Sequence, residues 1–289
     1  MTLRQALSVA RDRLIEAGIA PDEAAIDAEL FARTILGWDR ARILTESAQV
    51  APAPLEPKFS QWVARRETRE PSAYIIGIRE FYGLEFEVTP AVLIPRHETE
   101  IIVEAALPLL VRKLDARVAD VGTGCGNIAV TLAHEARPCT VVATDVSGEA
   151  LAVARRNAAR HGVFNRIQFA QTPYLDGVAG PFDLIAANPP YVREIDRAGL
   201  SPTVLHEPEV ALFGGANGMR DIEGVLGAAV AKLRLGGTLI MEFGFGQEDD
   251  VRARVAAHDD LRLDRVVADL QGLPRTAMIT RDRRKSPRR

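Results

Sequence analysis

Short apolar runs that alternate with helical stretches fill the second part of the chain, and this alternation constrains the fold more than any other feature. The runs cover residues 118–121, 141–144, 167–169, 183–185 and 239–241. Strands that alternate with helices form parallel β-α units, because two parallel strands need a long crossover connection. The sequence therefore predicts a doubly wound, Rossmann-like α/β domain over residues 93–280.

Residues 1–70 carry a different, helical pattern. The apolar residues that recur there at helical spacing include Leu3, Leu7, Ala10 and Leu14, then Ile26, Leu30, Phe31 and Ile35, and finally Phe59, Trp62 and Val63. The segment has ten basic and eleven acidic residues, and a nearly neutral module fits protein docking, or packing against the second domain, better than nucleic-acid binding. The sequence predicts a small all-helical docking domain at residues 1–70.

Residues 71–92 form the predicted connector between these two domains. Strand character begins at Tyr74, and Leu84 and Phe86 alternate with polar residues after a turn at Tyr82-Gly83. The connector is therefore predicted to be a β-hairpin.

The charges are nearly balanced, with 36 basic and 39 acidic residues and a formal net charge of −3. Residues 281–289 alone hold six basic residues and one acid, so the remainder of the chain is near −8. A charged run at a terminus is typically solvated, and residues 281–289 are predicted to be a disordered basic tail. We expect no direct nucleic-acid binding, because the rest of the chain is acidic.

Two cysteines, Cys125 and Cys139, occur without a CxxC pattern, and no two of the five histidines have metal-ligand spacing. Neither a disulfide framework nor a metal site is indicated. Charged residues interrupt the first twenty positions, and no stretch approaches the about 18 uncharged apolar residues of a membrane span. We expect a soluble, cytoplasmic protein without a membrane partner.

A glycine-rich segment, Gly122-Thr123-Gly124-Cys125-Gly126, directly follows the first apolar run and precedes a helical stretch. Glycines at alternating positions let the backbone turn tightly and approach a ligand. Asp145 lies 19 residues beyond Gly126, at the end of the next run, where an acid can accept from both hydroxyls of a ribose. The alternative for Asp145, a helix N-cap, is a role that Ser147 fills at least as well. The spacing differs from that of dinucleotide and P-loop motifs, so a nucleoside without pyrophosphate is indicated, and S-adenosylmethionine fits best.

The tetrapeptide Asn188-Pro189-Pro190-Tyr191 directly follows the fourth apolar run. The Asn188 side-chain oxygen and the Pro189 carbonyl can accept from the N–H groups of a planar nitrogen, whose delocalised lone pair makes it a weak nucleophile. Tyr191 can then cover one face of that planar group. The alternative is an ordinary strand-terminating turn. Both motifs follow strand ends and should meet across one crevice, so the pattern predicts methyl transfer from S-adenosylmethionine to a planar nitrogen.

These residues, with further motifs, resemble the bacterial release factor glutamine methyltransferases. The further motifs are Tyr74-Ile75-Ile76-Gly77, Glu80-Phe81, Leu93-Ile94-Pro95-Arg96-His97-Glu98-Thr99-Glu100, Glu207-Pro208, Ala211-Leu212, Gly214-Gly215, Glu242, Gly244, Gln247, Asp269-Leu270-Gln271-Gly272 and Arg275. The resemblance implies a class I S-adenosylmethionine-dependent methyltransferase domain with a helical N-terminal domain. It also implies methylation of the side-chain amide nitrogen (N5) of the glutamine in the Gly-Gly-Gln loop of class 1 peptide chain release factors.

The resemblance also implies roles for individual residues. The glycine-rich segment and Asp145 then contact the cofactor, Asn188 contacts cofactor and glutamine, and the rest of the tetrapeptide shapes the glutamine pocket. This chain departs from the family in having His97 where proline is usual. It also has Pro173 and Tyr174 where an acid and a tryptophan flank the adenine. Tyr174 can still stack on the adenine, whereas Pro173 offers its amine no side-chain acceptor.

Three other functions are weighed against this one. The nearest is the related enzyme that methylates a glutamine of a large-subunit ribosomal protein, although residues 95–100 look more like the release factor type. The second is an adenine-N6 nucleic-acid methyltransferase, which would need a basic groove. The third is a non-catalytic cofactor-binding module, against which the intact tetrapeptide argues.

Overall fold

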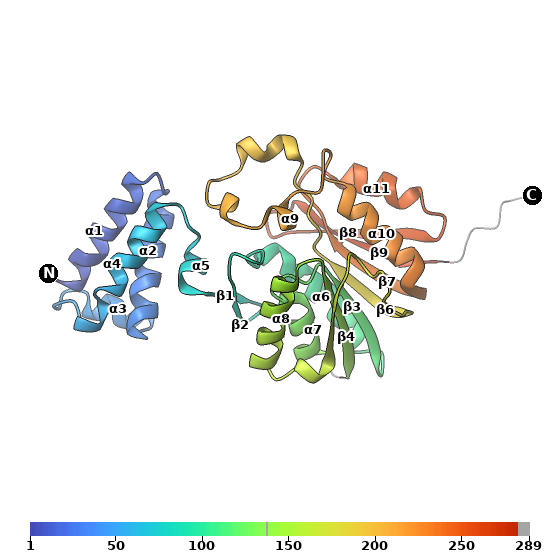
Figure 1. Cartoon of the computed structure of the whole chain (residues 1–289), viewed down its shortest axis with the longest axis horizontal. Helices are drawn as coiled ribbons and strands as arrows, with labels where there is room; N and C mark the ends of the chain where they lie inside the picture. Colours follow the sequence, from blue (N-terminus) through green and yellow to red (C-terminus); the bar gives the residue numbers. More distant parts are fainter. Residues whose placement is uncertain (137, 283–289) are drawn as a thin grey trace, which may run out of the picture. The chain divides into compact units, whose positions relative to one another are not determined.

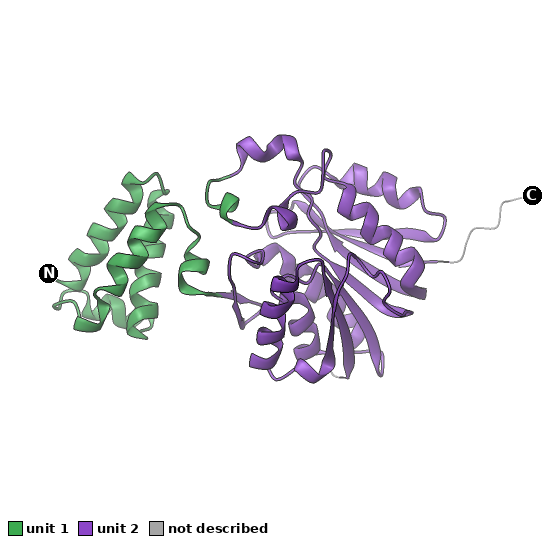
Figure 2. Cartoon of the chain, viewed as in Figure 1, with its two compact units in different colours: residues 1–78, 201–206 green, residues 79–200, 207–289 purple. Residues whose placement is uncertain are grey.

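The computed structural model describes residues 1–136 and 138–282. They form two compact units, green and purple in Figure 2: Met1–Ile78 with Ser201–His206, and Arg79–Leu200 with Glu207–Arg289 as far as it is described. We call them unit 1 and unit 2, and each has an apolar core of its own. The last strand extends to Arg281, where the basic tail was expected to begin, and residues 283–289 lie outside the described residues.

Unit 1 is helical, as its apolar spacing predicted. Its main helices are α1 (Leu3–Glu16), α2 (Pro21–Leu36), α3 (Arg40–Glu46), α4 (Lys58–Glu67) and α5 (Ser72–Ile76). α1 begins at a capping box: the Thr2 hydroxyl accepts from the Gln5 N–H at 3.2 Å, and the Gln5 side chain accepts from the Thr2 N–H at 2.9 Å. α2 begins at Pro21 and ends before Gly37, whose φ of 64° closes the helix in the left-handed region.

A buried ion pair holds the interior of unit 1. The Arg66 guanidinium is 1% exposed and donates to the Asp27 carboxylate at 2.6 Å. A buried charge is stable only when it is paired, so this contact ties α4 to α2. Arg66 also donates to the Thr203 hydroxyl at 3.4 Å, within the returning segment Ser201–His206 of the same unit.

The strand character predicted from Tyr74 onward was wrong for residues 74–76, which lie in the single helical turn of α5. Pro71 precedes this turn, and Gly77, with a φ of 85°, ends it. The two punctuating residues thus override the β propensity of the aromatic and β-branched residues between them.

The predicted β-hairpin follows α5. It consists of β1 (Ile78–Phe81) and β2 (Leu84–Glu87), which pair with each other. Its turn residues Tyr82 and Gly83 have φ angles of 53° and 72°, as a two-residue hairpin of the primed type requires.

Unit 2 is built around a sheet whose described strands run in the order β5-β4-β3-β6-β7-β9-β8 (Figure 1). The strands are β3 (Ala116–Val121), β4 (Cys139–Asp145), β5 (Ile167–Gln171), β6 (Phe182–Ala187), β7 (Leu233–Glu242), β8 (Leu261–Ala268) and β9 (Pro274–Arg281). β3 to β7 pair in parallel, as predicted, whereas β9 lies antiparallel between β7 and β8. The sheet is therefore mixed, and its antiparallel pair was missed.

The strand order reverses between β3 and β6, which are neighbours. Val121, the last residue of β3, is paired with Ala187, the last residue of β6. Gly122 and Asn188 therefore leave the sheet at adjacent positions. In open α/β sheets, ligands bind outside the carboxyl ends of the strands at this kind of reversal.

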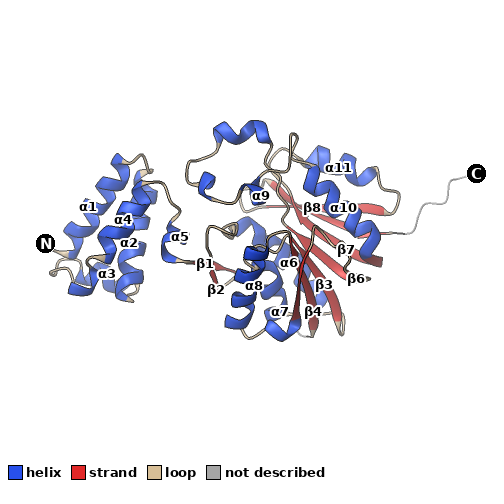
Figure 3. Cartoon of the chain, viewed as in Figure 1, coloured by secondary structure: helices blue, strands red, loops and turns tan. Residues whose placement is uncertain are grey.

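Helices cover both faces of the sheet (Figures 1 and 3). Their bounds are α6 (Glu100–Leu110), α7 (Asn127–Glu135), α8 (Gly148–Arg160), α10 (Arg220–Lys232) and α11 (Glu248–Ala256), with the short α9 (Glu209–Leu212). α10 and α11 pack on the face that carries Val121 and Ile185, and α6, α7 and α8 pack together in a second layer. No helix of the described residues is long and apolar enough to cross a bilayer.

Candidate active site

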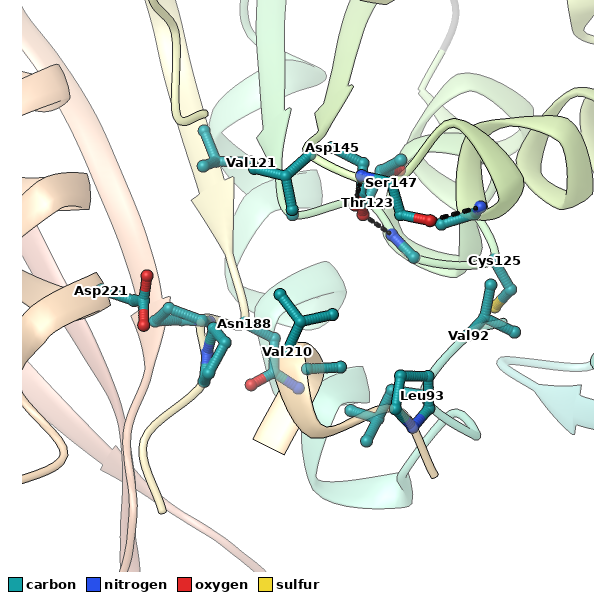
Figure 4. Close-up of a pocket in the computed structure, with 18 of the residues that line it drawn as sticks. Val92, Leu93, Val121, Thr123, Cys125, Asp145, Ser147, Asn188, Val210 and Asp221 are labelled. Atoms are coloured by element: carbon teal, nitrogen blue, oxygen red, sulfur yellow. Dashed lines mark hydrogen bonds between the residues drawn. The ribbon is translucent and has the colours of Figure 1, made fainter. Parts of the chain in front are cut away.

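A pocket lies in unit 2 at the carboxyl ends of the parallel strands, where the strand order reverses. The predicted site residues that line it are Gly122, Thr123, Gly124, Cys125, Asp145, Tyr174, Asn188, Pro189 and Pro190. Figure 4 shows Asp145, Ser147 and Thr123 on one side of this pocket and Asn188 on another. Gly126 and Tyr191 do not belong to the lining, although both lie in the segments that form it.

The glycines after β3 serve two different purposes. Gly122 and Gly124 have φ angles of 72° and 55°, and no described atom lies within 4 Å of where a Cβ would be. The backbone there is open to a ligand, and its conformation favours glycine. A Cβ on Gly126 would instead meet Ala154 Cβ at 3.1 Å, so Gly126 lets the loop approach α8 closely.

Asp145, at the end of β4, clamps the glycine loop. One carboxylate oxygen accepts from the Gly124 N–H and the other from the Ser147 N–H, both at 2.9 Å. Ser147 caps α8 by accepting from the Ala150 N–H at 3.1 Å, so it fills the capping role that was the alternative for Asp145. Burial raises the pKa of Asp145. Each of its oxygens keeps a second lone pair that a hydroxyl of a ligand can use.

A second carboxylate, Asp120, lies beneath the loop and was not assigned a role from the sequence. It is fully buried, and one oxygen accepts from the Thr123 hydroxyl at 2.6 Å and the Ala129 N–H at 3.0 Å. Burial raises the pKa of Asp120 to about 7. Asp120 therefore fixes the loop to α7 from within the core.

The Cys125 thiol is not a nucleophile. It is 1% exposed although its residue lines the pocket, and burial raises the pKa of Cys125 to about 12. The thiol therefore stays protonated near neutral pH. Among residues 1–136 and 138–282, no group of three or more His, Cys, Asp or Glu side chains could hold a metal ion.

The tetrapeptide after β6 belongs to a hydrogen-bonded network. The Asn188 side-chain NH2 donates to the Thr99 hydroxyl oxygen at 3.0 Å, and the Thr99 hydroxyl donates to a Glu242 oxygen at 2.7 Å. The Tyr191 hydroxyl donates to the other Glu242 oxygen at 3.2 Å. Sequence reasoning gave no role to Thr99 or Glu242, because they lie on η2 (His97–Thr99) and at the end of β7, far from Asn188 in the chain.

Two glycines leave room for the tetrapeptide backbone. A Cβ on Gly214 would lie 2.4 Å from the Pro190 carbonyl oxygen, and one on Gly218 would lie 2.3 Å from the Tyr191 carbonyl oxygen. Real Cβ atoms do not approach this closely, so glycine is required at both positions. The Gln247 side chain also donates to the Tyr191 carbonyl at 2.9 Å, which fixes the tetrapeptide from the side of α11.

Tyr174 is held in an unusual conformation beside the pocket, with a φ of 48°. Its ring packs on Gly224 of α10, where a Cβ would come within 2.0 Å of the Tyr174 ring carbon Cζ. Its hydroxyl donates to the Asp221 carboxylate at 3.1 Å. Asp221 therefore supplies an acid to the pocket lining beside the Tyr174 hydroxyl, although it lies 47 residues after Tyr174 in the chain.

Glu207 anchors the segment that follows Ser201–His206. It is 4% exposed, and its carboxylate accepts from the Ile94 N–H at 3.0 Å and from the Arg96 guanidinium. Pro208 and Val210, just after Glu207, line the pocket. The unexpected His97 lies next to Arg96, and its side chain is 66% exposed.

The fold and this pocket define a methyltransferase. Residues 99–217 match the methyltransferase small domain, and residues 5–77 match the PrmC N-terminal domain. The crystal structure of the hMettl16 catalytic domain in complex with MAT2A 3′UTR hairpin 1 has a similar fold, with a TM-score of 0.58 and 13% identity, over 88% of this chain and 92% of that one.

Curated relatives identify the family. The chain is 39% identical over 281 residues to the release factor glutamine methyltransferase of Koribacter versatilis, covering 96% of this chain and 98% of that protein. It is 39% identical over 285 residues to the release factor glutamine methyltransferase of Nitratidesulfovibrio vulgaris, covering 97% and 96%. The chain belongs to the release factor glutamine methyltransferase family, which confirms the family and the fold class predicted from its motifs.

Proposed function

We propose that this protein transfers the methyl group of S-adenosylmethionine to the side-chain amide nitrogen of the glutamine in the Gly-Gly-Gln loop of class 1 peptide chain release factors. The observation that supports it most is that Asp145 at the end of β4 and Asn188 just after β6, the two strands that flank β3, line the same pocket. Full-length similarity to proteins named release factor glutamine methyltransferases supports the choice of substrate.

The residues around the glycine loop fit a nucleoside cofactor. The open backbone at Gly122 and Gly124 leaves space for the amino-acid end of the cofactor, and the Asp145 oxygens accept from the ribose hydroxyls. Tyr174 and Asp221 lie where the adenine would be held. S-adenosylmethionine supplies an electrophilic methyl group on a sulfonium, and the role of the protein is to align the acceptor nitrogen with that group and to exclude water.

The tetrapeptide fits the acceptor nitrogen. An amide nitrogen is a weak nucleophile, because its lone pair is delocalised into the carbonyl. The Asn188 side-chain oxygen and the Pro189 carbonyl oxygen accept from its two N–H groups. No described donor pairs with the Pro189 carbonyl. These acceptors stabilise the positive charge that develops on the nitrogen during transfer. Tyr191 supports this arrangement through Glu242 and does not line the pocket.

Asp145→Ala is expected to weaken S-adenosylmethionine binding by about 1–3 kcal/mol, which is about five- to 150-fold in the dissociation constant. The substitution removes the ribose acceptor and also frees the Gly124 N–H. Isothermal titration calorimetry measures the change. Asp39→Ala is the matched control, because Asp39 also accepts from a backbone N–H, that of Arg42 at 2.8 Å, but lies in unit 1. An unaltered dissociation constant for Asp145→Ala would remove Asp145 from the cofactor site.

The helical domain at residues 1–70 is assigned to substrate docking. One glutamine side chain offers too little contact to distinguish a release factor from other proteins, so specificity needs a second surface. Unit 1 has its own core, and it exposes large apolar side chains that include Ile26 at 65% and Leu44 at 62%. These exposed residues are suited to contact a protein partner.

Deleting residues 1–70 should preserve cofactor binding and sharply reduce methylation of an intact release factor. The double variant Ile26→Asp/Leu44→Asp, which keeps the domain, is expected to lower kcat/KM for the intact release factor about tenfold. Val111→Asp is the matched control, because Val111 is 77% exposed and precedes the amino end of β3, whereas the pocket lies at the carboxyl ends of the strands. Unchanged kcat/KM in both unit 1 variants would refute the docking role. Joint loss of cofactor binding and solubility on deletion would favour a packing role.

A further inference from the structure

We propose that Thr99 and Glu242 are positioning residues that set which way the Asn188 side-chain amide faces, so that its oxygen, not its NH2 group, is presented to the acceptor nitrogen. This inference rests on the proposed function and deepens it. It concerns two residues that do not touch the substrate and act through Asn188.

The chain of contacts begins at Glu242, the last residue of β7. Glu242 is 1% exposed, and its two oxygens accept from two hydroxyls, those of Thr99 at 2.7 Å and Tyr191 at 3.2 Å. Burial raises the pKa of Glu242 to about 7, and the hydrogen bonds from Thr99 and Tyr191 oppose this rise. Above that pH the carboxylate is ionised and can only accept hydrogen bonds.

The direction of the next contact follows from this one. A hydroxyl has a single proton, and the Thr99 proton is committed to Glu242. Thr99 is itself 1% exposed, so no solvent water competes with Glu242 for this proton. Towards Asn188, at 3.0 Å, the Thr99 oxygen can only accept. The Asn188 NH2 must face Thr99, since the flipped amide would place two oxygens in contact with no proton between them.

The orientation of the amide decides whether the site can work. With the NH2 group turned to Thr99, the Asn188 oxygen is left as the acceptor for a substrate N–H. With the amide reversed, the NH2 group would face the N–H groups of the substrate, donor against donor. Asparagine rotamers with reversed amides differ little in shape, so packing alone does not choose between them. The hydrogen bond to Thr99 selects one of the two amide orientations.

Thr99→Val tests this directly, because valine keeps the shape of threonine and removes the hydroxyl. We expect kcat to fall about tenfold to a hundredfold, whereas the dissociation constant of S-adenosylmethionine stays within about twofold. Thr99→Ser, which restores the hydroxyl, should recover most of kcat. Thr131→Val is the matched control: Thr131 is equally buried and its hydroxyl has no hydrogen-bond partner among the described residues, so its kcat should stay at the wild-type value.

A second readout does not depend on the substrate. The 15N side-chain amide resonance of Asn188 should shift in Thr99→Val and return in Thr99→Ser. Should the valine variant not fold, Thr99→Ala carries the same expectation. Kinetics are measured with whichever acceptor the wild-type protein methylates, so a wrong choice of substrate is seen with the wild type alone. The inference is overturned if Thr99→Val keeps its kcat and its Asn188 resonance, or if serine and valine at position 99 reduce kcat equally.

Discussion

Asn188→Ala is expected to lower kcat for methyl transfer by about tenfold to a thousandfold, comparable to the loss of one positioned hydrogen-bonding group in other active sites. The side-chain oxygen of Asn188 acts on the acceptor nitrogen as it is alkylated, so its loss affects the transition state more than substrate binding. The KM for the protein substrate should change less than kcat. Steady-state kinetics with purified release factor measure both.

The fold should survive this substitution. Asn188 lies after β6 and is only partly buried, and its side chain makes one described hydrogen bond. Asn217→Ala is a suitable control. Asn217 also holds a turn, through its side-chain oxygen and the Met219 N–H at 3.1 Å, but it does not belong to the pocket lining. If Asn188→Ala kept near-normal turnover, Asn188 would have no catalytic role and would serve only in the turn after β6.

Gly224→Ala should disrupt the cofactor site by displacing the Tyr174 ring that lines it. The added Cβ would come within 2.0 Å of the Tyr174 ring, so the ring must move away from α10 and its hydrogen bond to Asp221 must break. Overpacking of this kind costs about 1–3 kcal/mol of the free energy of unfolding. Because Tyr174 lines the pocket, we expect the affinity for S-adenosylmethionine to fall at least about tenfold through lost stacking and displaced lining.

Gly227→Ala, one helical turn further along α10, is the matched control. No described atom lies within 4 Å of its Cβ position, so alanine there should stabilise the protein by about 0.4–1 kcal/mol and leave cofactor affinity unchanged. Thermal unfolding without ligand and calorimetric titration separate the two effects. If Gly224→Ala bound the cofactor as well as Gly227→Ala does, Tyr174 would not contact it.

The parallel half of the fold could be predicted because its signals are local. β3 to β7 alternate with helical stretches, and the near-continuous burial of β3, β4 and β6 appears in the sequence as short apolar runs. β8 has a mixed pattern of buried and exposed residues at the sheet edge, and the apolar run of its partner β9, Ala277-Met278-Ile279, lies between Arg275 and Arg281. In the part of the chain that the structure describes, no helix separates β8 from β9, so this pair lacks the alternation of strands and helices that identified the parallel strands, and it was missed.

The site could be predicted in the same partial way. Asp145 is the last residue of β4 and Asn188 directly follows β6, so the topology alone places both at the carboxyl ends of the parallel strands. Their supporting partners come from elsewhere: Thr99 is 89 residues from Asn188 and 143 residues from Glu242. Contacts over such separations leave no local pattern. A threonine before a helix and a glutamate at a strand end are read as ordinary capping and edge residues until the fold brings them together.

One measurement tests the central claim most directly. The protein is incubated with methyl-labelled S-adenosylmethionine and, separately, with a purified class 1 release factor, the same factor with its Gly-Gly-Gln glutamine replaced by alanine, a large-subunit ribosomal protein, and DNA. We predict that the intact release factor takes up the label, that peptide mass spectrometry places it on that glutamine, and that the alanine variant stays unlabelled. Label in the ribosomal protein or DNA with none in the release factor, or equal label in the alanine variant, would contradict the account.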